Sequence, residues 1–236
     1  MIKIYGVPIS VHTRKVIVAA IAKGLPHEVI PVVPVVPGNP PSNWREISPT
    51  GFIPALTDGD FTVADSAAIG AYLERKHPAT ALHPTSLYPA APEAYAQTLA
   101  LEQYAGKLFS DVVRPLFHEV FVHPKVRNIP TDQSKIDAVL NEAIPETFGY
   151  LDRVAGDGFL VGGTLSVADI AVASNLVTHQ YIGFDLYRAR FPRLAALFDR
   201  VVAQPAFREA LKREEGVVDS MGLKRDFLAA SQRKAA

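Results

Sequence analysis

The hydrophobic and polar positions of this chain follow two different patterns. Up to about residue 78, short runs of strand length alternate with segments whose apolar residues recur every three or four positions. After residue 91 the strand pattern stops, and helical periodicity covers residues 92–122, 132–154, 166–181 and 190–213. The chain therefore predicts a mixed α/β first domain followed by an all-helical second domain.

The first domain opens with a strand, a helix and a second strand. Residues 2–5 alternate as a short strand, and a helical pattern follows with Ser10 at its N-cap position. Gly24 ends this helix, and residues 27–33 read as a second strand parallel to the first. This order predicts a βαβ unit.

A hairpin and a further helix complete the first domain. Residues 54–57 and 61–63 form two strands about the Asp-Gly turn of residues 58–60. Asp65 or Ser66 then opens a helix, which ends before Pro78 because the residue before proline disfavours the helical conformation.

The predicted domain boundaries follow from these patterns. Residues 1–78 form the mixed domain, the proline-containing and aperiodic residues 79–91 form a linker, and residues 92–236 form the helical domain. Within the last of these, Ser166 and Asp169 have the spacing of a capping box, with Asp in place of the commoner Glu.

Charge and composition exclude several functions. Lys and Arg together number 24, as do Asp and Glu, so no overall basic field attracts nucleic acid or anionic lipid. No apolar run approaches the roughly 20 residues that cross a bilayer, and no secretion signal is visible at the start. We therefore expect a cytoplasmic protein with a small neutral or zwitterionic partner.

The absence of cysteine restricts the chemistry. With no Cys, the chain has no disulfide, no thiolate metal site and no cysteine nucleophile of its own. Its seven His lack the spacing of a helical metal pair, so no metal site is expected. Any sulfur chemistry requires a thiol brought by the substrate.

Ser10 is the first candidate for chemistry. It stands at the start of a helix directly behind the first strand, where unpaired amides and the helix dipole favour an anion. A thiol held there ionises more readily than in water. The alternative is that Ser10 only caps the helix.

Two further features of the first domain suit a peptide-like ligand. A cis bond between Ile53 and Pro54 would leave the backbone of Ile53 unpaired and able to pair with a ligand as added strand, although Pro54 alone is compatible with a plain strand start. Asp65 and Ser66, at another helix start, suit the carboxylate and ammonium of an amino-acid head group, the alternative again being an ordinary cap.

Taken together, these motifs resemble the cytosolic glutathione transferases, in particular bacterial members with a catalytic serine. The resemblance covers about residues 1–212 and is carried by Gly-Val-Pro-Ile-Ser at 6–10, Ile-Pro at 53–54, Asp-Ser-Ala-Ala-Ile at 65–69 and Leu-Ser-Val-Ala-Asp-Ile at 165–170. It implies a thioredoxin-like N-terminal domain that binds glutathione and an all-α helical bundle that carries the co-substrate pocket.

The resemblance also assigns roles to single residues. It implies that Ser10 donates its hydroxyl to the glutathione sulfur and that Ile53, beside a cis Pro54, pairs with the cysteinyl backbone. It implies that Asp65 and Ser66 take the γ-glutamyl head. It further implies a homodimer with glutathione as co-substrate and no metal.

The chain departs from the family pattern in several places. The lack of Cys disfavours thiol-disulfide exchange on the enzyme, and the Ser-Ser-Cys run of the maleylacetoacetate isomerase branch is absent at residues 9–11. Phe52 stands where relatives often have Lys or Gln, and Trp44 occupies the loop that usually holds the glycyl carboxylate. We expect Trp44 to make a hydrophobic contact beneath that loop.

The second substrate is expected between the Ser10 loop and the long first helix of the bundle. Tyr104, Lys107, Leu108, Asp111 and Arg114 share one stripe at three- and four-residue spacing, and His12 lies two residues after Ser10. The alternatives are a solvated or dimer-forming stripe and an exposed His12.

These features predict a glutathione transferase whose bound thiolate attacks a small hydrophobic electrophile or reduces a peroxide. Two alternatives remain open. One is a non-catalytic interaction module with the same fold, and the other is a dedicated glutathione-dependent dehalogenase or isomerase.

Overall fold

The computed structural model describes residues 1–34, 36, 38–79 and 85–227. The chain forms two compact units. The first comprises Met1–Tyr88 together with Gln204–Gly216, and the second comprises Pro89–Ala203 and the chain after Gly216. Part of the predicted linker, residues 80–84, lies outside the described residues, and the predicted domain boundaries stay a prediction.

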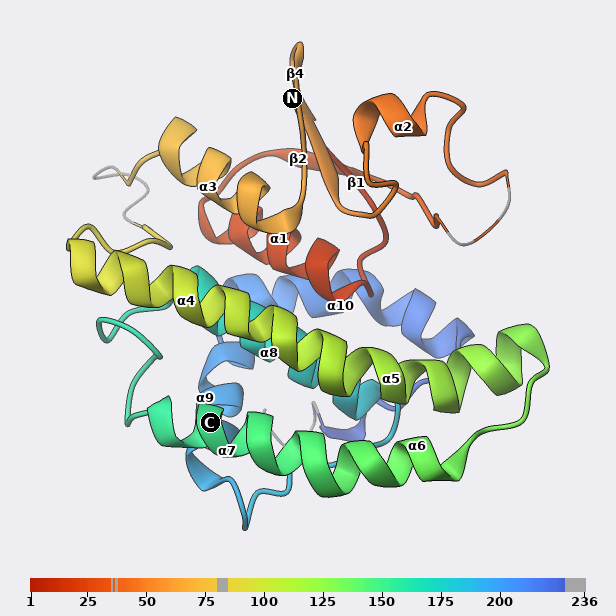
Figure 1. Cartoon of the computed structure of the whole chain (residues 1–236). Coiled ribbons are helices and arrows are strands. Elements are labelled where there is room, and N and C mark those ends of the chain that lie inside the picture. The colour runs from red at the N-terminus through yellow and green to blue at the C-terminus, as the bar shows by residue number, and fades with distance from the viewer. Residues whose placement is uncertain (35, 37, 80–84, 228–236) are drawn as a thin grey trace. The chain divides into compact units, whose positions relative to one another are not determined.

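A four-stranded sheet organises the first unit (Figure 1). Its strand order is β2-β1-β3-β4, with β1 and β2 parallel and the other neighbours antiparallel. The predicted βαβ unit and hairpin are therefore confirmed. The strands are β1 (Ile2–Tyr5), β2 (His27–Ile30), β3 (Ala55–Asp58) and β4 (Phe61–Ala64).

Three helices of the first unit follow its first, second and last strands in the chain. Two of them, α1 (Val11–Ala22) and α3 (Ser66–Lys76), pack on each other and on the sheet, while the short α2 (Trp44–Ile47) contacts β4. Ile4 and Leu56 face each other across β1 and β3 and are fully buried. The alternation of strand side chains thus directs one face of the sheet toward the helices.

The second unit is helical in its described part, with long helices formed from short pieces (Figure 1). The predicted segments over 92–122, 132–154 and 166–181 all fold as helix. The longest of these segments packs on α8. The pieces are α4 (Pro92–Leu108), η1 (Phe109–Val113), α5 (Arg114–Phe117), η2 (His118–Arg127), α6 (Gln133–Ala138), η3 (Val139–Ala143), α7 (Ile144–Val154), α8 (Val167–Tyr181) and α9 (Pro192–Val202).

Prolines explain two of the π-helical turns. Pro115 and Pro145 each stand directly after the first residue of a regular helix that follows a π-helical turn. Proline has no backbone N–H to donate to the preceding turn, so the hydrogen-bond ladder is locally rearranged there. The helix continues through both positions because the wider π-helical turn tolerates the loss of the proline's backbone hydrogen bond.

The prediction of one helical segment over residues 190–213 was wrong. Helix α9 ends at Val202 and α10 (Pro205–Ser220) begins three residues later. The residue before Pro205 is driven away from the helical conformation, which separates the two helices. Residues 204–216 then belong to the first unit rather than the second.

A fully buried ion pair joins α10 to α1 inside the first unit. The Arg14 guanidinium donates from Nε to Oε1 of Glu214 at 2.6 Å and from Nη2 to Oε2 at 2.7 Å. Neither side chain is exposed to solvent. Such a two-bond fork matches a carboxylate in both distance and direction, which makes it specific as well as strong.

A second buried ionisable group lies in the helical unit. His179 of α8 is fully buried, its Nε2 lies 3.1 Å from the Asp185 carbonyl, and its ring packs against Phe148 and Phe184. Burial lowers the pKa of His179 from 6.5 to about 4, although the Asp185 carbonyl opposes this shift. The imidazole is therefore neutral in the folded protein near pH 7.

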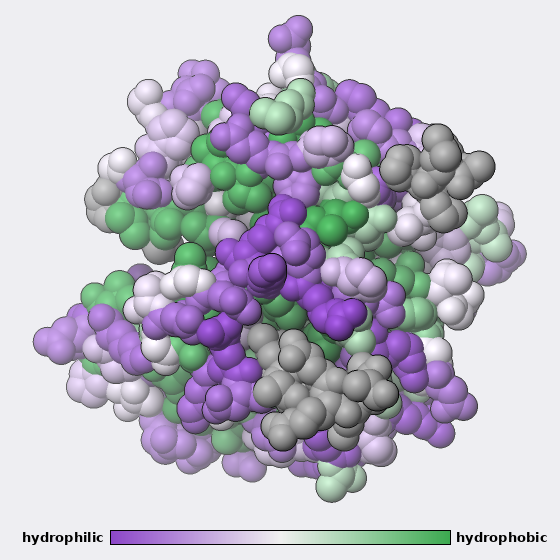
Figure 2. All heavy atoms as spheres, turned by 180° about the vertical axis from the view of Figure 1, so that it is seen from behind, coloured by the Kyte–Doolittle hydropathy of each residue, from purple (hydrophilic) through white to green (hydrophobic). Residues whose placement is uncertain are grey.

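The described helices include none that is long and apolar enough to cross a membrane. Hydrophilic and hydrophobic side chains are interspersed over the face drawn in Figure 2.

We expect Glu214→Ala to destabilise the protein strongly. The substitution leaves the Arg14 guanidinium buried without its carboxylate, which typically costs about 3–5 kcal/mol. Glu209→Ala is the matched control, because the neighbouring Glu209–Arg213 pair on the same helix is largely exposed and such pairs contribute about 0–1 kcal/mol. Urea unfolding measures both, and equal losses would contradict a special role for the buried pair.

We also expect acid to destabilise the folded state through His179. Between pH 6.5 and about 4, His179 is protonated in the unfolded chain but neutral in the folded protein. The free energy of unfolding therefore decreases as the pH is lowered through this window. The loss approaches about 3 kcal/mol for one such histidine. His179→Gln should flatten the dependence of the free energy of unfolding on pH, whereas His27→Gln, at a partly buried position, should change it less.

Candidate active site

The strand register brings the three predicted motifs to one end of the sheet. Tyr5 is the partner of Ala55, and Ala55 is also the partner of Ala64. The segment leading to Ser10 follows Tyr5, Pro54 precedes Ala55, and Asp65 follows Ala64. A hydrogen bond of 3.3 Å from the Asp65 amide to the Pro54 carbonyl joins two of these segments directly.

Ser10 is the N-cap residue of α1, as predicted, but its hydroxyl does not cap the helix. Its backbone is extended, its carbonyl accepts the first helical hydrogen bond from Arg14 at 2.8 Å, and its side chain makes no capping hydrogen bond. The residue is partly exposed. The hydroxyl therefore lies at a helix start but accepts no hydrogen bond from the backbone amides there.

The segment before Ser10 is held closely against the helix. A Cβ on Gly6, whose φ is +156°, would lie 2.4 Å from Oγ1 of buried Thr13, so only glycine fits. The Arg14 Nη2 donates to the carbonyl of Ile9 at 3.1 Å in addition to its bond to Glu214. The ion pair thus also positions the residue directly before Ser10.

The sequence analysis did not identify Arg14 or Glu214 as positioning residues. The two lie 200 residues apart, and Glu214 sits among other charged residues on a helix that reads as surface. No local pattern distinguishes a carboxylate that the fold buries from one that it exposes.

The Ile53–Pro54 peptide bond is cis in the structure. Ile53 is partly buried and packs on a small apolar cluster that includes Trp44. Trp44 also donates from Nε1 to the Gly51 carbonyl at 3.0 Å, so it supports the loop from beneath, as expected. Phe52, by contrast, is 74% exposed.

Asp65, rather than Ser66, caps α3. Its carboxylate Oδ1 accepts hydrogen bonds from the amides of Ala67 and Ala68 at 2.8 and 3.1 Å. Its φ of +84° is rare for a residue with a side chain, and such backbone strain is common where a site requires a particular orientation. Ser66 follows in the first turn and is buried.

His12 lies in the first turn of α1 and is partly buried. Burial lowers its pKa from 6.5 to about 4, with a further lowering by Lys15 and an opposing effect of Asp65. The imidazole is therefore neutral near pH 7. The negative charge of Asp65 raises its pKa, but by less than burial lowers it.

The predicted co-substrate stripe lies on α4, η1 and α5 of the helical unit, and Arg114, its last member, is exposed. Leu108 is fully buried and belongs to the core of that unit. Tyr104 is partly exposed and its ring lies 4.2 Å from that of Tyr150, while Lys107 forms an ion pair with Asp111. Burial raises the pKa of Tyr104, so its phenol stays protonated.

Among the described residues, no group of three or more His, Asp or Glu side chains is arranged to hold a metal ion. The first unit instead combines a serine hydroxyl at a helix start, a neutral imidazole and a capping carboxylate at one sheet end. This arrangement suits a small zwitterionic ligand that carries an ionisable group for Ser10.

Two family models match the chain. The glutathione S-transferase N-terminal domain matches residues 4–81, and the glutathione S-transferase C-terminal domain matches residues 117–214. The first of these matched regions contains Ser10, Ile53, Pro54, Asp65 and Ser66.

Individual relatives and solved structures agree with this assignment. Glutathione S-transferase Z1 of Arabidopsis thaliana is 28% identical over 91% of this chain and 93% of its own, and human glutathione S-transferase theta-2B is 29% identical over 83% and 78%. A glutathione S-transferase from Rhodospirillum rubrum superposes with a TM-score of 0.77 at 25% identity, covering 89% of this chain and 92% of the other.

The prediction of a thioredoxin-like domain followed by a helical domain is confirmed by this structural similarity and by the observed sheet. With both domain models matched and the relatives aligned over most of their length, the chain belongs to the glutathione S-transferase family and is a glutathione transferase.

Proposed function

We propose that this enzyme binds reduced glutathione in the first unit and stabilises its thiolate through the Ser10 hydroxyl. The observation that carries the proposal is that Ser10 stands at the start of α1 while its side chain makes no capping hydrogen bond. The hydroxyl can therefore donate to sulfur, and the dipole of α1 favours the negative charge.

The energy required is modest. Lowering a thiol pKa from about 8.5 to about 7 corresponds to about 2 kcal/mol. A hydrogen bond to a charged group contributes about 1.5–3 kcal/mol, and a helix start adds about 0.3–1 kcal/mol. One serine and one helix terminus are thus sufficient, and no general base is needed.

Two other segments hold the tripeptide in this proposal. The backbone of Ile53, beside the cis Pro54, pairs with the cysteinyl backbone of glutathione. Both capping bonds of Asp65 end on Oδ1, so Oδ2 remains for the ammonium of the γ-glutamyl group, and Ser66 at the start of α3 receives its carboxylate.

The thiolate then attacks a hydrophobic electrophile, forming a carbon–sulfur bond as the leaving group departs. Alternatively it attacks a peroxide oxygen, which breaks the O–O bond, releases an alcohol and oxidises the sulfur to a sulfenic acid; a second glutathione then converts this to the disulfide and water. His12, Tyr104, Lys107 and Asp111 are proposed to contact this co-substrate, and Leu108 to support them from the core. A cytoplasmic homodimer that uses no metal completes the proposal.

Ser10→Ala should reduce kcat by about 10- to 100-fold while changing glutathione affinity less, because the lost hydrogen bond strengthens with charge on sulfur. The pKa of the bound thiol, read from the pH profile of kcat/KM, should rise. Stability should change little, since the hydroxyl makes no cap bond. Ser10→Thr, which keeps a hydroxyl, is the control, and unchanged turnover in the alanine variant would remove Ser10 from the mechanism.

Asp65→Asn should weaken glutathione binding about tenfold with little loss of stability, because Asn still caps a helix and tolerates positive φ but carries no charge for an ammonium. Calorimetric titration and thermal unfolding measure the two effects. Asp152→Asn is the control, since Asp152 caps α9 through two similar bonds to the amides of Arg193 and Leu194. Equal affinities in all three proteins would exclude Asp65 from the glutathione site.

Retention on immobilised glutathione separates the enzyme from a non-catalytic interaction module. We expect retention of the wild-type protein and elution by the free tripeptide. A panel of electrophiles, peroxides and halogenated substrates then distinguishes a general transferase from a dedicated isomerase or dehalogenase.

A further inference from the structure

A hollow lies within the helical unit. It has a volume of about 350 Å³ and is formed near the junction of α5, η2 and α6. Four of its seven lining residues are basic or histidine, and Glu119 is the one acidic residue among them. The lining residues are Ser110, Arg114, Pro115, His118, Glu119, His123 and Lys135.

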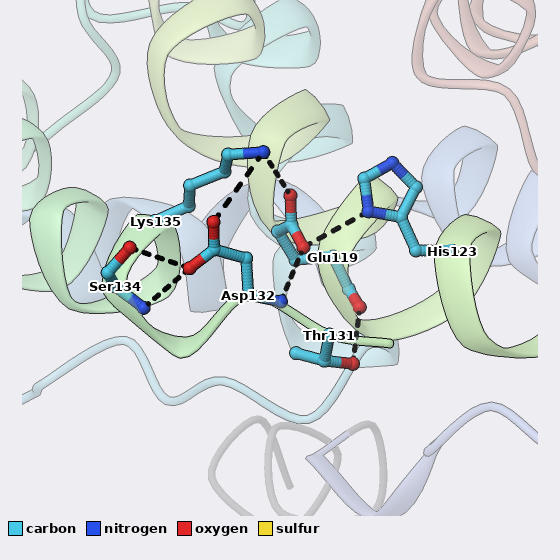
Figure 3. Close-up of polar contacts among 6 residues, drawn as sticks. All are labelled: Glu119, His123, Thr131, Asp132, Ser134 and Lys135. Atoms are coloured by element: carbon cyan, nitrogen blue, oxygen red, sulfur yellow. Dashed lines mark hydrogen bonds and ion pairs between the residues drawn. The ribbon is translucent and has the colours of Figure 1, made fainter. Parts of the chain in front are cut away.

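Both oxygens of the Glu119 carboxylate already interact with other groups of the chain (Figure 3). Its Oε2 accepts the Asp132 amide at 3.0 Å and lies 3.1 Å from Nδ1 of His123, and its Oε1 lies 3.5 Å from the Lys135 ammonium. The Asp132 hydrogen bond is the main reason that the pKa of Glu119 is lowered. This buried anion therefore joins the start of η2 to the N-cap residue of α6.

The nearby Asp132 is occupied as well. It caps α6, with Oδ1 accepting from the amide and the hydroxyl of Ser134 at 3.0 and 2.6 Å. Lys135 lies 3.8 Å from its other oxygen and 3.5 Å from Glu119, both long contacts for a largely exposed ammonium. Lys135 can therefore move toward another anion at little cost.

Arg114 and His118 are not neutralised in the same way. Within the part of the chain that the structure describes, the exposed Arg114 guanidinium has no hydrogen bond or ion pair. The pKa of His118 is lowered, first by burial and then by the positive charges of Arg114, His123 and Arg127, with Glu119 opposing. Positive potential thus accumulates on one side of the hollow.

We propose that this hollow binds the oxyanion group of a small molecule, a carboxylate or a phosphate. Arg114 can donate two parallel hydrogen bonds, His118 can donate a ring N–H, and the Lys135 ammonium can move toward the anion. Glu119 and His123 line the same hollow. The volume accommodates a ligand of several heavy atoms, and the site needs no contribution from the glutathione-binding unit.

Binding at this site takes up a proton. The groups that face His118 are Arg114 from α5, Glu119, His123 and Arg127 from η2, and Lys135 from α6. An anion between Arg114 and His118 offsets the positive potential and stabilises the imidazolium, so affinity is greater at pH 6 than at pH 8.

Isothermal calorimetry on the full chain tests the proposal, with inorganic phosphate and succinate titrated separately at low ionic strength, where screening is weak. We expect saturable binding of at least one anion and a shift of the His118 NMR resonance. Arg114→Ala and His118→Gln should each weaken binding about tenfold, and Arg114→Lys less. Arg193→Ala, at an exposed arginine of α9, is the control and should bind as the wild type does.

The choice between the two anions identifies the source of the oxyanion. Preference for phosphate assigns a phosphorylated ligand, and preference for succinate assigns an organic acid. Binding that is lost equally in the Arg193 control, or no saturable binding of either anion by the folded protein, would overturn the proposal. Glutathione retention is independent of these outcomes, so failure here leaves the proposed transferase function untouched.

Discussion

The buried pair of Arg14 and Glu214 is the interaction on which the first unit depends. It brings a segment near the end of the chain into the same compact unit as the first helix, and the same guanidinium holds the Ile9 carbonyl next to Ser10. An unpaired charge at this depth is unfavourable by several kcal/mol, so the observed hold on the Ile9 carbonyl requires Glu214 to pair with Arg14. The stability of the first unit and the position of the Ile9 carbonyl therefore both depend on the Arg14–Glu214 pair.

The register of the sheet explains why three motifs that are weak one by one lie at the same end of it. Each of them is a plausible cap or strand start by itself, yet Tyr5, Ala55 and Ala64 lie in one row across three strands. The residues that flank this row must meet at one end of the sheet. Ser10 and Asp65 are both N-cap residues, but only the Asp65 side chain accepts hydrogen bonds from its helix.

The two units offer different electrostatic environments. The first presents a serine, a neutral imidazole and a carboxylate that suit a zwitterion with an ionisable thiol. The second gathers Arg114, His118 and Lys135 around a carboxylate already satisfied by the protein. A chain with equal numbers of acidic and basic residues thus still contains a local cluster of basic side chains.

The sequence alone determined the local structure and the chemistry available. Hydrophobic periodicity and turn residues predicted the βαβ unit, the hairpin and most helices, because these depend on contacts between near neighbours. The absence of cysteine excluded a thiol nucleophile of the chain's own. Only the tertiary structure decided that Gln204–Gly216 belong to the first unit, that Glu214 is buried against Arg14 and that Arg114 has no hydrogen bond or ion pair among the described residues. These outcomes depend on which distant side chains share a low-dielectric interior, and residue spacing carries no information about that.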